Sequence, residues 1–205
     1  MRFKYLFIVL FSIVSVSSFF SQVSTIDFQL ANKYYLDSDY EKAALYYEKI
    51  FKESEHRLKI YENYKSTFIE LNKIKEAEKL SKTLIKENPN KLKFLVDLGL
   101  IYGLADRIDK KNQVFDKAIE EINKETSYDN AFDLGLAFEK IGYLEKALDV
   151  YLNFESKNLQ NPFAFHSKIA LIYNRTAQTN KMINTFFEML DFNNKFLQNV
   201  QNGLV

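Results

Sequence analysis

Residues 134–151 read LGLAFEKIGYLEKALDVY, and this stretch contains the pattern that predicts the fold. Apolar side chains recur at intervals of three and four on both sides of Gly142, which is typical of two amphipathic helices around a short turn. Gly135 in the first segment and Ala147 in the second are small, and two helices approach closely only where a side chain is nearly absent. The stretch therefore predicts a helical hairpin, with its large aromatic residues filling the space toward the next hairpin.

The hairpin pattern recurs along most of the chain at a nearly fixed period. Aromatic residues equivalent to Phe138 follow one another at spacings of 34, 34, 36 and 35 residues: Tyr34, Phe68, Tyr102, Phe138 and Tyr173. Three positions before each of them stand Ala31, Lys65, Gly99, Gly135 and Ala170. Thirteen positions after them stand Tyr47, Ser81, Phe115, Tyr151 and Phe186. A period of 20–50 residues indicates a stack of repeated supersecondary units.

We call the aromatic residue of each unit that is equivalent to Phe138 its column aromatic. Each unit has a turn position four residues after this residue. These turn residues are Ser38, Asn72, Asp106, Gly142 and Ala177, of which Ala177 alone is neither a capping residue nor glycine. In the first unit, Ser38 and Glu41 have the spacing of a capping box, so we expect Ser38 to cap the second helix of that hairpin.

Three stretches resemble the tetratricopeptide repeat family, whose unit has 34 residues. They are Leu98-Gly99-x-x-Tyr102, Leu134-Gly135-x-x-Phe138 with Gly142-x-x-x-x-Ala147, and Asp39-Tyr40-Glu41-Lys42-Ala43 through Tyr47. The chain departs from the family pattern at Lys65 and Lys111, which occupy columns of small residues, and it has no tryptophan. The resemblance implies an all-α fold, a right-handed α-α superhelix of about five helix-turn-helix repeats.

The resemblance also implies the domain bounds. The expected repeats cover 24–57, 58–91, 92–125, 128–161 and 163–190. Residues 194–205 place Phe196, Leu197, Val200 and Leu204 on one helical stripe, which indicates either a C-terminal capping helix or the first helix of a truncated repeat.

The N-terminal segment has the layout of a secretory signal peptide, which we place at residues 1–21. Arg2 and Lys4 precede an apolar run, and small residues follow it. An uncleaved membrane anchor is the alternative, because no charged residue occurs from Tyr5 to Ile26. Either interpretation predicts an exported protein: periplasmic or secreted if the segment is cleaved, and anchored in the inner membrane facing the periplasm if it is not.

The composition argues against several chemical functions. The 205 residues include no cysteine and two histidines, which excludes disulfide scaffolds and thiolate zinc sites. The 28 basic and 27 acidic residues nearly balance, so charge gives no case for nucleic-acid binding. We expect His56 to be solvated, His166 to pack in the core, and the chain to need no cofactor or metal and to be no enzyme.

Function is therefore expected to come from the surface of the array. In the resembling family, the first helix of each hairpin lines a concave groove that binds peptides or helical segments. The resemblance places this groove at Phe28, Asn32, Tyr35, Ser66, Leu100, Phe132, Leu136, Asn174 and Arg175, with Glu62, Ile69, Glu139 and Leu171 on the same stripe. Asn32 stands where the family has an asparagine of a carboxylate clamp, but Phe28 replaces the lysine of that clamp.

The expected partners are other proteins or peptides, with envelope proteins as candidates. Two alternatives stay open. Leu100, Leu136 and Leu171 could fill a tight superhelix instead of binding a ligand. The whole array could also be a structural spacer or an oligomerisation arm of a longer exported protein.

Overall fold

The computed structural model describes residues 25–192, and every regular element in this range is helical. After a first helix at residues 25–36 come α2 (Tyr40–Phe51), a 3-10 turn (Ser54–His56), α3 (Arg57–Glu70), α4 (Ile74–Glu87), α5 (Lys93–Leu104), α6 (Ile108–Glu120), α7 (Tyr128–Lys140), α8 (Leu144–Lys157), α9 (His166–Arg175) and α10 (Thr179–Phe192). The helices pair into five hairpins, which confirms the predicted all-α, tetratricopeptide-like fold. The expected signal segment, 1–21, and the expected capping helix, 194–205, lie outside the described residues.

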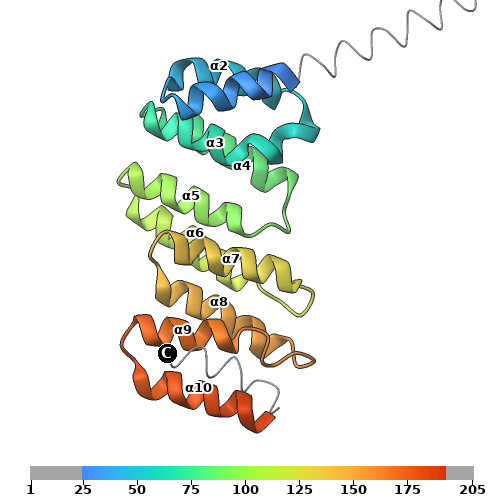
Figure 1. Ribbon diagram of the computed structural model, residues 1–205, viewed down its shortest axis with the longest axis vertical. Coiled ribbons are helices and arrows are strands. Elements are labelled where there is room, and N and C mark those ends of the chain that lie inside the picture. Colours follow the sequence, from blue (N-terminus) through green and yellow to red (C-terminus); the bar gives the residue numbers. More distant parts are fainter. Residues whose placement is uncertain (1–24, 193–205) are drawn as a thin grey trace, which may run out of the picture. The chain divides into compact units, whose positions relative to one another are not determined.

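The chain divides into two compact units, and the division falls after Leu80, within α4. The first unit contains the helix at residues 25–36, α2 and α3, and the second contains α5 to α10. In the second unit the hairpins α5–α6, α7–α8 and α9–α10 follow one another in chain order (Figure 1). Among the described residues, no helix is both long enough and apolar enough to cross a membrane.

All five hairpins turn through one residue with a left-handed backbone. The five residues are Ser38, Asn72, Asp106, Gly142 and Ala177, with φ between 54° and 82°. In each turn, the N–H of the next residue donates to the carbonyl oxygen of the column aromatic at 2.8–3.0 Å, as Tyr143 does to Phe138. The left-handed residue itself donates three residues back, as Gly142 does to Glu139. This pair of bonds is the Schellman motif, which satisfies carbonyl groups that a helix end leaves open.

The turn geometry corrects the predicted capping box. Ser38 has a φ of 59°, so it is the left-handed residue that ends the first helix and does not cap the second. Asp39 is the cap instead, because its carboxylate accepts a hydrogen bond from the backbone N–H of Lys42 at 3.3 Å.

Glycines in two of the first helices allow an aromatic ring of the second helix to pack against the backbone. A Cβ atom added to Gly99 would overlap the Phe115 ring, and one added to Gly135 would overlap the Tyr151 ring. The same rings also contact the next hairpin. The centroids of Phe115 and Phe138 are 5.1 Å apart in an edge-to-face arrangement, and those of Tyr151 and Phe165 are 4.7 Å apart. The aromatic residues therefore fill the space between hairpins, as the sequence predicts.

Local contacts accommodate the two lysines that stand in columns of small residues. Lys111 lies opposite Gly103, where an added Cβ would sit 3.3 Å from the lysine Cδ, and its Nζ donates to the hydroxyl of Tyr143 at 3.1 Å. Lys65 is buried and forms an ion pair with Glu62 at 2.8 Å. Both segments are helical despite these departures from the family pattern.

The turn at Ala177 predicts a stabilising substitution. A non-glycine residue with positive φ carries a steric cost of about 1–2 kcal/mol, which glycine avoids at a smaller cost in chain entropy. We expect Ala177→Gly to raise the free energy of unfolding by about 0.5–1 kcal/mol in urea denaturation. Ala105 ends α5 with a φ of −91°, so Ala105→Gly should bring no gain. An equal gain in both variants would contradict this explanation.

The close helix contacts predict opposite effects for the same substitution at two glycines. Gly135→Ala should destabilise the chain by about 1–3 kcal/mol, because the new methyl group overlaps the Tyr151 ring. Gly103→Ala meets only the flexible side chain of Lys111 and should stabilise by about 0.5–1 kcal/mol through helix propensity. Thermal denaturation followed by circular dichroism measures both, and a stabilised Gly135→Ala variant would be the contrary result.

Candidate functional site

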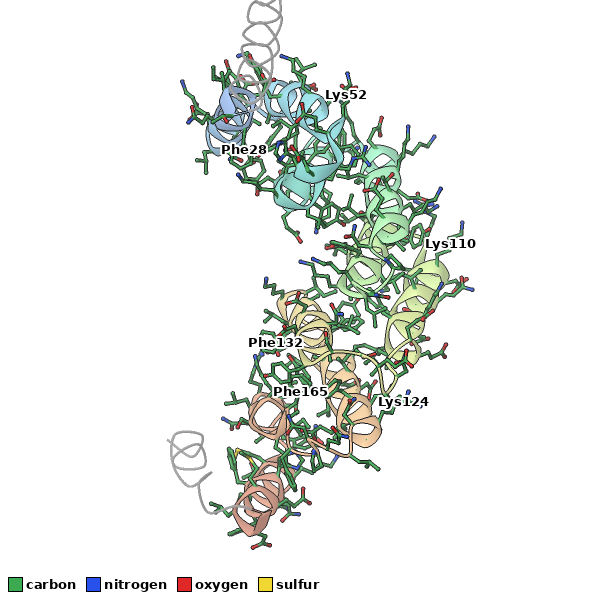
Figure 2. All side chains as sticks on the ribbon, turned by 90° about the vertical axis from the view of Figure 1, so that its right-hand side faces the viewer. Phe28, Lys52, Lys110, Lys124, Phe132 and Phe165 are labelled. Carbon is green, nitrogen blue, oxygen red and sulfur yellow. The ribbon has the colours of Figure 1, made fainter. Side chains whose placement is uncertain are left out.

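The first helices of the hairpins form one side of the second unit. Figure 2 shows Phe132, on α7, on this side and Lys110, on α6, on the other. We define the α7–α9 surface by six residues of these two helices: Phe132, Leu136, Glu139, Lys168, Leu171 and Arg175. Within each helix the three positions are three or four residues apart, so they share a helical face.

Glu139 joins the two helices of this surface. Its side chain is 13% exposed, and its Oε1 accepts hydrogen bonds from the Tyr151 hydroxyl at 2.7 Å and from Lys168 Nζ at 3.3 Å. Its Oε2 accepts from Arg175 Nη1 at 3.4 Å. Burial raises the pKa of Tyr151, and the bond to Glu139 raises it further, so the hydroxyl stays protonated as a donor. One carboxylate thus holds two cations at the rim of the surface.

Apolar side chains lie beside these cations. Phe132 is half-buried, and Lys168 Nζ lies 5.3 Å from the centroid of its ring. The ring of Tyr128 stacks with that of Phe132, with a distance of 6.1 Å between the two centroids. Leu136 is half-buried, and Leu171 is 45% exposed. The surface therefore combines net positive charge with accessible apolar area.

The other two predicted groove residues of the second unit are also on first helices. Leu100 is half-buried on α5, and Asn174 is exposed on α9 beside Arg175. The structure brings together Phe132, Glu139 and Arg175 through their contacts with Lys168 or with one another.

The predicted groove residues of the first unit are largely engaged in contacts within that unit. Asn32 Oδ1 accepts hydrogen bonds from the Tyr47 hydroxyl at 2.8 Å and from Asn63 Nδ2 at 3.2 Å, so this oxygen links three helices. The Phe28 ring lies 4.3 Å from Lys59 Nζ. Tyr35 makes edge contacts with the rings of Tyr40 and Tyr47, and Ser66 is half-buried on α3.

Lys168 is a member of the surface that the sequence interpretation missed. It lies one position after the column of Phe132, so a search along that column passes over it. A signal was available in the charges, because basic residues follow Glu139 at 29 and 36 positions, close to one repeat. Such a spacing places opposite charges on neighbouring first helices.

Both histidines contact carboxylates, which corrects the expectation that His166 only packs in the core. His166 Nδ1 lies 2.8 Å from Glu155 Oε2, outside hydrogen-bond alignment, and Nε2 lies 3.3 Å from Glu188 Oε2. The other oxygen of Glu155 accepts the backbone N–H of Phe165 at 2.6 Å. Burial lowers the pKa of His166, but the two carboxylates outweigh burial and the pKa is raised overall.

His56 lies in a cluster with two exposed carboxylates. Its Nε2 is 3.4 Å from both Glu53 and Glu55, and Glu53 stands three residues earlier, a spacing that the sequence interpretation overlooked. All three ligand atoms lie close enough to share one cation, but both carboxylates are solvent-exposed. The cluster is therefore a group of solvent-accessible polar contacts at the 3-10 turn.

No protein-family model and no curated protein matches this chain. Among solved structures, it is similar to MamA at 17% identity, with 87% of this chain and 96% of MamA covered and a TM-score of 0.43. It is also similar to nearly identical TPR-like repeats of a Podosopora anserina protein described as a kinesin light chain, at 13% identity, 88% and 94% coverage and a TM-score of 0.45. Because these TM-scores are below 0.5, the tetratricopeptide-like fold rests on the five turns and hairpins described above.

The contacts of His166 predict a pH dependence of stability. Because its pKa is raised in the folded chain, its contribution is complete below the ordinary histidine pKa near 6.5 and is lost as pH rises through the folded value. We expect the melting temperature of the wild type to fall more between pH 5.5 and pH 8.5 than that of His166→Gln. Glu188→Gln keeps the histidine but removes one carboxylate, so the decrease in its melting temperature should lie between those of the other two proteins. Identical pH profiles for wild type and His166→Gln would disprove the assignment.

Proposed function

We propose that this protein is a non-catalytic interaction scaffold that binds peptide or helical segments of other proteins on its first-helix surfaces. The observation that carries the proposal is the α7–α9 surface. Exposed Leu171 lies on the same helical face as Lys168 and Arg175, which Glu139 holds in place. An apolar anchor surrounded by ordered polar groups is the composition of protein-binding hot spots.

We further propose that the scaffold works in the bacterial cell envelope. Support for this location comes from the N-terminal sequence, in which two basic residues, an apolar run and small residues follow one another. Envelope proteins are then the partners that the scaffold meets.

A spacer or oligomerisation arm is the second candidate function. The observation that favours it is the exposure of Phe187, at 59%, on α10, the last helix of the described chain. An exposed phenylalanine on the last described helix offers a contact to another copy or to a further segment. Light scattering after size-exclusion chromatography separates the two functions, because an oligomerisation arm gives a multimer that Phe187→Glu dissociates.

Selection from a displayed peptide library tests the scaffold function directly. We expect selected peptides to bind with micromolar dissociation constants in fluorescence anisotropy, and Leu171→Glu to weaken them at least about tenfold. The matched control is Leu152→Glu on α8, where the leucine is 42% exposed but lies on the second helix of its hairpin. Its effect should stay below about twofold. Peptides that bind equally well to Leu171→Glu would show that this surface is not the binding site.

A further inference from the structure

We propose that the α7–α9 surface recognises a side-chain carboxylate of its partner, placed next to an apolar side chain. The occupant is an acidic, apolar peptide segment in which an Asp or Glu meets Arg175 and Lys168 while a neighbouring apolar residue packs on Leu171. The inference rests on the proposed scaffold function and names the chemistry of the partner at the same site.

The charge inventory of the surface points to an anionic group. Glu139 is one carboxylate between two cations, so the three side chains together carry one net positive charge. Asp133, which follows Phe132 on α7, is an exposed carboxylate next to the surface in the sequence. It occupies the repeat position that Lys168 occupies on α9, and Lys168 faces the preceding first helix. By the same geometry, we expect Asp133 to face α5 and not to neutralise Lys168 and Arg175.

The two cations retain donors beyond those that Glu139 uses. A guanidinium group has five N–H donors and an ammonium group has three. Arg175 donates to Glu139 through Nη1, and Lys168 donates through Nζ. Arg175 is 51% exposed and Lys168 is 31% exposed, so a partner carboxylate can reach them without burial of the whole site. An arginine fork also matches a carboxylate in shape, which allows two parallel hydrogen bonds.

Glu139 acts as a positioning residue in this arrangement. Long cationic side chains lose rotamer freedom when they bind a ligand, and that loss weakens affinity. Glu139 is nearly buried and is itself held by the Tyr151 hydroxyl at 2.7 Å, so it fixes both cations before a partner arrives. The rotamer freedom of Lys168 is restricted further by its contact with the Phe132 ring.

The apolar part of the surface fixes which acidic segments fit. Leu171 lies between Lys168 and Arg175 in the sequence of α9, three and four residues from them, so all three share one helical face. A carboxylate bound to the cations therefore brings its neighbouring side chain next to Leu171. A purely acidic segment would leave this leucine exposed, whereas a mixed segment covers it.

Reversing one charge on the protein and one on a selected peptide tests the inference. Peptides selected on the wild-type chain should be enriched in Asp or Glu beside Leu, Ile or Phe. Arg175→Glu should weaken them at least about tenfold, and the same peptide with its acidic residue changed to Lys should recover most of the loss on Arg175→Glu. Lys140→Glu is the matched control, because it makes the same change of charge at an exposed position of α7. It should weaken binding less than about threefold.

Amidated peptides, a folding check and a second variant complete the test. Peptides with an amidated C-terminus should bind as well as free ones, since the bound carboxylate is a side chain, and a requirement for the free terminus would overturn the inference. Circular dichroism checks that Arg175→Glu folds, and Lys168→Gln provides a milder second variant with the same expected direction. Binding that depends on Leu171 but not on Arg175, Lys168 or peptide acidity overturns this inference while the scaffold function stands. Binding that is insensitive to Leu171→Glu overturns both.

Discussion

The fold depends on one backbone constraint, a single left-handed residue between the two helices of every hairpin. This residue lets the next N–H reach the carbonyl oxygen of the column aromatic, so the chain reverses within a few residues and the helix end is satisfied. The same constraint applies in all five hairpins, although the residue that adopts this conformation differs, being glycine at Gly142 and alanine at Ala177. A conformation that only glycine adopts freely is therefore imposed on alanine by the packing around it.

The second constraint is the distance between the helices of a hairpin. Where the first helix has glycine, an aromatic ring of the second helix lies against its backbone, as with Gly99 and Phe115. The other side of that ring packs against the next hairpin, through Phe138. One aromatic side chain thus sets both the spacing within a hairpin and the spacing between two hairpins.

Two tyrosines at one repeat position organise polar groups on the first helices. Tyr47 donates to Asn32 in the first unit, and Tyr151 donates to Glu139 in the second. In the first unit the acceptor links helices of the core. In the second, the acceptor is a carboxylate that also holds Lys168 and Arg175. The same packing position therefore supports a structural hydrogen bond in one unit and, by our proposal, a recognition surface in the other.

The sequence by itself determined the all-α hairpin array, its period and its turn positions, because these follow from local spacing of apolar, aromatic and small residues. It also gave Phe132 and Arg175 as surface candidates. Only the tertiary structure decided that Ser38 ends a helix rather than capping one, and that Lys168 and His166 pair with carboxylates far away in the chain. The role of Ser38 depends on its backbone dihedral angle, and the charge pairs depend on which helices pack side by side. A one-dimensional pattern records spacing along the chain, but neither the backbone conformation of one turn residue nor the charges that packing brings together.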